Sequence, residues 1–235
     1  MSTIREQILT AIESKLEEIL VSKGYAVNCG HNVFRGVKPT DSDDLPAICF
    51  FPGVESIARE YGKGALSMPV RVEGVAIFGA TNPSVISEKI LGDLIEAMAG
   101  RKWVVPFTSG GTYRVKAGDT IEGASSSATG YVESVSVSSG TWAGGDAAGN
   151  ITIRRKSGTF EAENLDVGSE SNVATTTGSL TYQEPIETTT NNLADDIQYI
   201  EGGLEDYPEG GDIAVGAHST FTIIYQTVSG NPFAQ

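Results

Sequence analysis

The sequence predicts an α+β fold: a mixed or antiparallel sheet with helices packed on it, together with a small inserted all-β domain. Three observations predict this fold. Residues 68–100 combine a strand pattern with an amphipathic helix pattern, residues 3–23 show a second helical period, and the middle of the chain is rich in Gly, Ser and Thr without such a period. We therefore expect residues 1–105 with 185–235 to form a discontinuous α+β domain, and residues 106–184 to form the inserted all-β domain.

The N-terminal helix is predicted over residues 3–23. Its apolar residues recur at three- and four-residue spacing and form one stripe: Ile4, Ile8, Leu9, Ile12, Leu16, Ile19 and Leu20. Thr3 and Glu6 stand at the spacing of a capping box, and Gly24 supplies a stop. A single amphipathic helix cannot bury its stripe alone, so this one must lie on a sheet or on a neighbouring subunit.

Three short strands are predicted next. They cover residues 33–37, residues 47–51 (closed by Pro52-Gly53) and residues 54–61. The strand at residues 68–78 follows and leads into a helix over residues 83–100. Thr81 or Asn82 is the predicted N-cap of that helix, and Pro83 suits its first turn because its missing N–H has no partner there.

The inserted segment is predicted to contain strands at residues 113–115, 131–137, 151–154 and 180–182, separated by Gly-rich turns. The tetrapeptide Ser139-Gly140-Thr141-Trp142 recurs loosely as Ser157-Gly158-Thr159-Phe160, which indicates a repeated hairpin-like unit. Disorder is the alternative for such a composition. The segment nevertheless contains enough apolar side chains to form a small core.

The residue pattern of the C-terminal segment resembles that of residues 1–105 rather than that of the inserted segment. Residues 193–199 are acidic and partly apolar, residues 202–211 are predicted to form a loop, and residues 217–228 alternate as a strand. Such a strand needs a partner, and we expect it to pair with the strand at residues 68–78.

The net charge is strongly negative and unevenly distributed. The 235 residues carry a formal charge of −14, and residues 185–235 hold eight acids without a Lys or Arg. Proteins that bind DNA directly neutralise phosphates with basic side chains, so this composition argues against direct DNA binding. The acidic surface either keeps the protein soluble, or it repels a passing polyanion or docks a basic partner.

The sequence shows no membrane segment and no recognisable catalytic, cofactor or metal motif. No apolar run approaches the roughly 20 residues of a membrane helix. His31 and His218 have no nucleophile motif beside them, and the spacing at Cys29 does not suit zinc. We expect no enzymatic activity, no cofactor and no metal, with Cys29 and Cys49 as free thiols.

Residues 1–105 joined to 185–235, about two thirds of the chain, resemble the tail terminator proteins of long-tailed bacteriophages, the minor tail protein U-like group. The resemblance lies in the order of parts. An amphipathic N-terminal helix is followed by the Pro-bounded strand Leu45-Pro46-Ala47-Ile48-Cys49-Phe50-Phe51-Pro52, by a long strand leading into a second helix, and by the stretch Leu193-Ala194-Asp195-Asp196-Ile197-Gln198-Tyr199 before a closing strand. The insertion departs from the minimal family pattern.

The resemblance implies a virion structural protein, made in the bacterial cytoplasm and placed at the neck of the tail. Such a protein forms a homo-oligomeric ring of six that caps the tail tube protein, ends tube polymerisation and offers a docking surface to head–tail connector proteins. DNA passes only transiently through the central channel, and no membrane is involved. An acidic lining would repel the DNA phosphates, so that DNA would not bind to the wall of that channel.

Two sets of candidate site residues follow from the resemblance and the charge pattern. The candidate channel-lining acids are Glu201, Glu205, Asp206, Glu209 and Asp212. The candidate subunit-interface residues are Arg59, Glu60, Lys63, Arg71 and Glu73, for which an ordinary solvated face is the alternative.

Two other functions stay open at this point. The chain could be another head–tail connector or a tail tube protein, since these also use small α+β or β-rich subunits. The inserted domain could instead bind carbohydrate for adhesion, with Trp142, Tyr113 and Tyr131 stacking on sugars. Their place in an apolar alternating pattern favours core packing over sugar binding.

Overall fold

The computed structural model of this chain describes residues 2–39, 41–59, 63–77, 82–111, 113–207, 214–228 and 230–235, with the backbone alone described at residues 58, 59, 63, 206 and 207. The chain divides into two compact units. Unit 1 contains residues 1–21, 25–100 and 185–235, and unit 2 contains residues 22–24 and 101–184. The structure is 47% strand and 21% helix, so the fold is more strongly β than the predicted class suggests.

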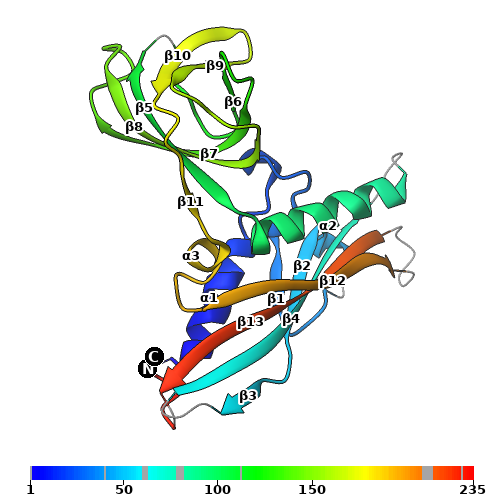
Figure 1. Cartoon of the computed structure of the whole chain (residues 1–235). Coiled ribbons are helices and arrows are strands. Elements are labelled where there is room, and N and C mark those ends of the chain that lie inside the picture. The colour runs from blue at the N-terminus through cyan, green and yellow to red at the C-terminus, as the bar shows by residue number, and fades with distance from the viewer. Residues whose placement is uncertain are drawn as a thin grey trace. The chain divides into compact units, whose positions relative to one another are not determined.

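Unit 1 is built on one six-stranded mixed sheet (Figure 1). Its strand order is β1-β2-β4-β13-β12, and β3 pairs with β4 on the same edge as β2. Only the β1–β2 pair is parallel among these described strands. The strands are β1 (Val33–Arg35), β2 (Ala47–Pro52), β3 (Ser56–Arg59), β4 (Lys63–Ile77), β12 (Asp196–Tyr207) and β13 (Ala214–Val228).

The centre of this sheet joins the two ends of the chain. β4 and β13 pair antiparallel along their full length, from Lys63 opposite Val228 to Ile77 opposite Ala214. This confirms the predicted pairing of the C-terminal strand with the strand at residues 68–78, of which Phe78 lies outside the described residues. The first hundred residues and the last fifty therefore share one sheet.

The sheet has a helix-side face and an outer face, because alternate residues of a strand point to opposite sides. Met68, Val70 and Val72 of β4 are fully buried in the core that packs with the helices, as is Phe221 of β13. The alternate positions lie on the outer face and are mainly polar, with Arg71 and Glu73 in β4 and Thr220 and Thr222 in β13. This matches the alternation predicted from the sequence.

Helix α1 (Ile4–Leu16) begins as predicted, with the Thr3 side chain accepting a hydrogen bond from the N–H of Glu6 at 3.1 Å. The predicted end at residue 23 is wrong, because the helix stops at Leu16 and the chain continues into the short 3₁₀ turn η1 (Val21–Lys23). Gly30 explains the early end. Its N–H donates to the carbonyl of Ile19, and it packs so tightly that a Cβ there would lie 2.7 Å from the carbonyl oxygen of Leu16. The turn η2 (Cys29–His31) thus occupies the space that further helical turns would need.

Helix α2 (Pro83–Ala99) lies across the helix-side face of the sheet (Figure 1). Asn82 caps it by accepting a hydrogen bond from the N–H of Ser84, whereas the alternative cap Thr81 lies outside the described residues. The helix approaches β4 at Gly74, where a Cβ would lie 2.4 Å from Cγ2 of Ile90. Glycine in the middle of this strand therefore permits close helix–sheet packing.

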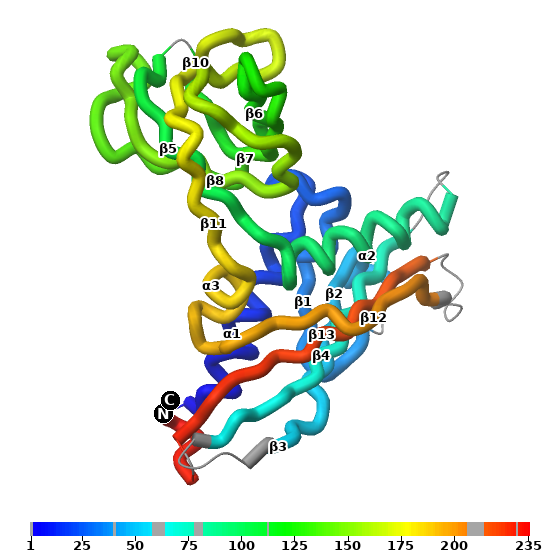
Figure 2. The backbone as a smooth tube through the Cα atoms, in the orientation of Figure 1, coloured from blue at the N-terminus to red at the C-terminus, as the bar shows by residue number. Residues whose placement is uncertain are grey.

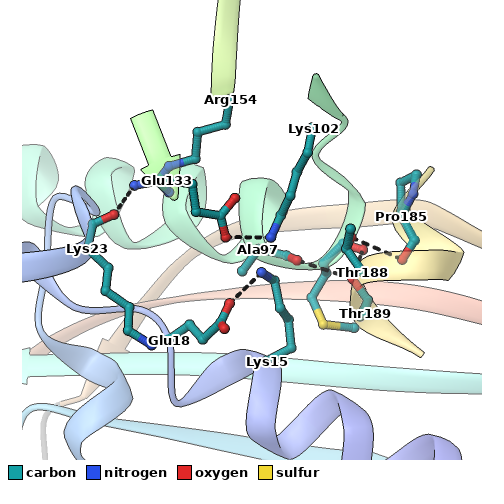
Figure 3. A network of polar contacts seen from close by, with 11 residues as sticks. Lys15, Glu18, Lys23, Ala97, Lys102, Glu133, Arg154, Pro185, Thr188 and Thr189 are labelled. Atoms are coloured by element: carbon teal, nitrogen blue, oxygen red, sulfur yellow. Dashed lines mark hydrogen bonds and ion pairs between the residues drawn. The ribbon is translucent and has the colours of Figure 1, made fainter. Parts of the chain in front are cut away.

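The end of α2 is held by the short helix α3 (Pro185–Thr189), which comes from the C-terminal segment. The hydroxyl of Thr189 lies 3.4 and 3.3 Å from the carbonyl oxygens of Ala97 and Met98, two of the carbonyls that a helix end leaves without an internal partner (Figure 3). The chain termini also meet in unit 1, where the N–H of Ile4 donates to the carbonyl of Pro232 at 2.9 Å (Figure 1).

The predicted loop over residues 202–211 is wrong in its first part, because Gly202 to Tyr207 belong to β12. Their pairing with β13, as in Leu204 opposite Ala217, outweighs the local preference of Gly and acidic residues for loops. Gly202 also has a packing role, since a Cβ there would lie 2.8 Å from the hydroxyl of Tyr199. Residues 208–211 lie outside the described residues.

Unit 2 is a small closed barrel of six strands with one further strand attached (Figure 2). The order β10-β9-β6-β7-β8-β5 closes through pairing of β10 with β5, and β11 adds to β5. The strands are β5 (Lys102–Gly110), β6 (Thr120–Gly123), β7 (Thr129–Ser139), β8 (Ala147–Ser157), β9 (Glu163–Val167), β10 (Glu170–Thr176) and β11 (Thr181–Gln183). Because β5 starts at Lys102, the inserted segment of unit 2 begins at Arg101 rather than at the predicted residue 106.

The predicted strand at residues 113–115 is not one; Val115 is instead buried in the barrel core and Tyr113 packs against it. The two halves of the tetrapeptide repeat each follow a long strand, where Gly140 and Gly158 adopt positive φ angles of 68° and 72°. After these turns, Phe160 enters the barrel core and Trp142 packs against it.

Candidate functional site

The outer face of the sheet in unit 1 carries a cluster of charged side chains, which we call the sheet-face cluster. It consists of Lys38, Arg71, Glu73, Glu205 and His218. β4 supplies Arg71 and Glu73, β12 supplies Glu205 and β13 supplies His218, while Lys38 comes from the connection between β1 and β2. Side chains from four separate segments of the chain therefore meet on one face.

The register of the sheet brings these residues together. Glu73 is paired with Cys49 on one side and with His218 on the other. Arg71 is paired with Thr220, which in turn is paired with Glu201. Directly paired residues in neighbouring strands project to the same face of a sheet. Glu201 consequently shares the outer face with the sheet-face cluster.

Glu73 is the centre of the cluster and is only 3% exposed. Its two carboxylate oxygens bind different cations: Lys38 Nζ lies 2.6 Å from Oε2, and Arg71 Nε lies 2.7 Å from Oε1. Arg71 also donates to Glu205, whose Oε1 lies 3.1 Å from Nδ1 of His218. A buried carboxylate is stable only with such partners, so the cluster acts as one electrostatic unit.

The two cysteines are buried thiols of unit 1 and are not joined to each other. Burial raises the pKa of Cys49 to about 12, and the negative charge of Glu73 beside it acts in the same direction. Burial, with Asp93 nearby, likewise raises the pKa of Cys29 to about 12. Both thiols are therefore protonated at neutral pH and fill core space.

The two predicted sets of site residues do not occupy separate surfaces. Glu205, a candidate channel-lining acid, is ion-paired with Arg71, a candidate interface residue, and Glu73 is part of the same cluster. Glu201 is exposed on the same face. Glu60, Glu209 and Asp212 lie outside the described residues, as do the side chains of Arg59, Lys63 and Asp206.

Lys38 and His218 were missed as members of a charged cluster. His218 stands at the same alternate positions of the terminal strand as the polar residues Thr220 and Thr222. This alternation is the signal that predicts an outward-facing His218. Its contact with Glu205 depends on β12 being a strand, which the sequence did not indicate. Lys38 lies in a connecting segment, where periodicity gives no information about position.

A second set of ionic contacts fixes α1 to the rest of unit 1. Arg35 of β1 binds Glu6 with both guanidinium nitrogens, each at 2.8 Å from a carboxylate oxygen. The hydrogen bond from Arg35 lowers the pKa of Glu6, against a smaller opposing effect of burial. The neighbouring Arg5 donates to the carbonyl of Gly53 at 3.0 Å. These contacts have a structural role, because they hold the helix against the rest of unit 1. The sheet-face cluster therefore remains the candidate site.

Unit 1 also has an open hollow of about 600 Å³ beside α1. Polar side chains line most of it, including Gln7, Thr10 and Ser14 of α1 and Asn191 from the segment after α3. Lys15 and Glu18, which also line it, are ion-paired with each other at 2.5 Å (Figure 3). This hollow is too polar and too open to resemble a typical small-molecule pocket.

The barrel holds a buried carboxylate of its own, Glu163, which is 6% exposed. It accepts hydrogen bonds from the N–H groups of Ser125, Ser126 and Glu161 at 2.7 to 3.0 Å, and from the Ser126 hydroxyl. Burial raises the pKa of this carboxyl, but the hydrogen bonds outweigh burial and lower it to about 2. Glu163 therefore ties the turn between β6 and β7 to β9.

A shallow hollow of about 590 Å³ lies at the barrel surface beside Trp142 and Arg114. The indole of Trp142 stacks on the ring of Phe107, with centroids 5.1 Å apart and planes inclined by 16°. Tyr113 and Trp142 both pack against the barrel core, which supports core packing for these aromatic residues over stacking on a sugar. Arg154 covers the ring of Tyr131 at 4.8 Å from its centroid.

Within the part of the chain that the structure describes, no three His, Cys, Asp or Glu side chains come together as metal ligands would. Among the same residues, no helix combines the length and apolar character needed to cross a bilayer.

No protein-family model matches this chain, and no curated protein matches it.

Proposed function

We propose that this chain is a virion structural protein that forms a ring on the end of a phage tail tube, ends tube polymerisation and presents a docking surface to the head-side connector. The proposal rests on the resemblance of its parts to tail terminator proteins, which are α+β subunits with helices packed on a sheet. Its main structural support is the pairing of β4 with β13, because this pairing makes a single subunit of the two segments that carry the resemblance.

The proposed function depends on contacts between protein surfaces and requires no catalytic step. Tube growth is a head-to-tail association that continues until one end is blocked. A ring whose one face matches the tube end, and whose other face does not, stops that growth. The proposed partners are therefore the tail tube protein on one face and head–tail connector proteins on the other.

We further propose that the outer face of the sheet lines the DNA channel. Both cations of the sheet-face cluster are paired with carboxylates, Lys38 with Glu73 and Arg71 with Glu73 and Glu205. A paired cation attracts phosphate less than a solvated one, and Glu201 adds an exposed negative charge to the same face. DNA would slide past such a surface without being held.

The capping activity can be tested with purified components. Full-length protein, added to tail tube protein that is polymerising, is expected to stop elongation, so that tube length falls as the added concentration rises. Electron micrographs of the tubes provide the measurement. If the chain instead elongates into long tubes by itself, it is a tube protein, and if tubes grow to unchanged length, the capping function is wrong.

The channel assignment predicts an effect of charge at Glu201. Glu201→Lys is expected to slow DNA release from assembled virions several-fold, because the added cation binds phosphates. The matched control is Glu88→Lys, which reverses an exposed acid on α2, on the opposite side of the sheet. Equal release rates for both variants and the unsubstituted protein, measured by dye entry into ejected DNA, would contradict the channel assignment.

A further inference from the structure

We infer that copies of this chain join by sheet extension, with the β12 edge of one copy pairing with the β1–β3 edge of the next. This inference rests on the proposed ring and names the surfaces that close it. The β12 edge consists of β12 itself, and the β1–β3 edge consists of β1, β3 and the two residues before β3, Val54 and Glu55, on the other side of the same sheet.

Both edges carry unpaired strand backbone within the described residues. β12 pairs with β13 alone over Asp196–Tyr207, and its other side has no strand. On the opposite side, β1 pairs only with β2, and β3 only with β4. An exposed strand edge is a ready template for another chain, and long ones are normally protected by another segment or by a partner.

Apolar side chains gather at the same two edges. On β12, Ile200 is 53% exposed, Leu204 46% and Tyr199 41%. At the opposite edge, Val54 is 89% exposed and Ile57 of β3 65%. Apolar groups of this size at both ends of one sheet are typical of a surface that a protein partner covers.

The charges of the two edges differ. β12 holds Asp196 and the exposed Glu201, and it contains no Lys or Arg. Neither β1 nor β3 contains an acid, and Arg35 of β1 is already paired with Glu6 of α1. Like charges disfavour contact between two β12 edges, whereas β1 and β3 add no negative charge to such a contact. The occupant of the β12 edge is therefore a second copy of this chain that offers its other edge.

Strand direction also suits this pairing. β12 runs antiparallel to β13, β13 to β4, and β4 to both β2 and β3, while β1 is parallel to β2. β12 therefore runs opposite to β1 and β3. If the next copy is generated by rotation about an axis close to the strand direction, its β1–β3 edge meets β12 antiparallel, the more favourable arrangement. Repetition of one unlike contact under rotation closes a ring.

Two double variants test the pairing by blocking one edge each. Ile200→Lys with Leu204→Lys blocks the β12 edge, and Val54→Lys with Ile57→Lys blocks the β1–β3 edge. All four side chains are at least 46% exposed, so folding should be retained. Each variant alone is expected to lose the ring and to associate at least tenfold more weakly. The control is Val21→Lys, which charges a residue that is 52% exposed and lies on neither edge.

The mixture of the two variants gives the sharpest result. Each variant keeps one intact edge, so the mixture is expected to form a dimer and to stop there, with the mass of two chains by light scattering. A β12-to-β12 contact would instead let the β1–β3 variant assemble by itself and would give no mixed dimer, which overturns the inference. Ile200→Gln with Leu204→Gln replaces the first variant if circular dichroism shows that it is unfolded.

The outcomes also separate this inference from the proposed function. If the unsubstituted protein forms rings and both blocked variants still form them, the edge pairing is wrong and the proposed function stands. If the unsubstituted protein forms no ring on its own or on tubes, the proposed function and the edge pairing both fail.

Discussion

Replacing Glu163 by Gln is expected to lower the free energy of unfolding of unit 2 by about 3 kcal/mol at pH 7. The carboxylate is buried and accepts bonds from the N–H groups of Ser125, Ser126 and Glu161. An amide can accept at one oxygen only, and its NH₂ group would face N–H donors. The magnitude follows from the pKa of about 2 against the ordinary 4.5 for this carboxyl.

The same contact makes unit 2 sensitive to acid. The pKa of Glu163 is lower in the folded protein than in the unfolded chain, so its contribution to stability is complete above about pH 4.5. That contribution is lost as the pH falls toward 2, where the folded protein also takes up the proton. The Gln variant should therefore lose this part of the pH dependence and approach the stability of the unsubstituted protein near pH 2.

The measurement is denaturant unfolding followed by tryptophan fluorescence between pH 7 and pH 2. Both tryptophans of the chain, Trp103 and Trp142, lie in unit 2, so the signal reports that unit alone. Glu122→Gln is the matched control, because Glu122 is an exposed acid on the neighbouring strand β6. A loss below 0.5 kcal/mol for the Glu163 variant at pH 7, within the usual range for surface substitutions, would contradict this account of the turn.

Replacing Arg71 by Ala is expected to destabilise unit 1 by about 2–3 kcal/mol. Removing one partner of a buried ion pair commonly costs about 3–5 kcal/mol, because the other charge stays buried without compensation. Here the guanidinium side chain is 39% exposed and Lys38 still binds Glu73, so screening and the second cation reduce the cost. Glu73 and Glu205 would both lose a partner in the variant.

Cysteine labelling measures this effect in unit 1 specifically. Cys29 and Cys49 both lie in unit 1 and are fully buried, so a thiol reagent reaches them only when the unit opens. The Arg71 variant should label about 30- to 150-fold faster, which corresponds to the stated loss at about 1.4 kcal/mol per factor of ten. Lys89→Ala, at an exposed position of α2, should label at the unsubstituted rate. Equal rates for the two variants would show that the sheet-face cluster does not stabilise the sheet.

The parts of the fold that were predicted well are those with a strong local signal. The starts of α1 and α2 follow from Thr3, Asn82 and Pro83, and the Thr3 and Asn82 side chains cap them as expected. Glu6 does not complete the predicted capping box, because its carboxylate binds Arg35 instead. The pairing of β4 with β13 was predicted because a strongly alternating terminal strand needs a partner, and the strand at residues 68–78 was the obvious one.

The errors have a common physical cause, which is tertiary structure acting where the local signal is weak. Gly202 and Leu204 look like loop residues in sequence, yet pairing with β13 makes them a strand. The end of α1 is set by Gly30, which is remote from it in sequence. The boundary at Gly100 was missed because Trp103 and Val105 suit either unit by composition, and their pairing with β8 assigns them to the barrel.

The candidate site was predicted as two groups of residues, without their arrangement. Charge alone indicated that Arg71, Glu73 and Glu205 matter, but only the sheet register places them in one cluster with Lys38 and His218. Registers between strands distant in sequence depend on the whole fold, so no local pattern contains this information.

The central claim is that identical copies of this chain close into a ring, and its most direct measurement is the mass and end-on shape of the purified full-length protein. Mass photometry or native mass spectrometry gives the number of 24.7 kDa chains in each particle, and electron micrographs give the symmetry. We predict closed rings with a central hole and one fixed subunit number, six by the family resemblance. A monomer that forms no ring even on tail tubes, or open filaments of no fixed length, would contradict the claim.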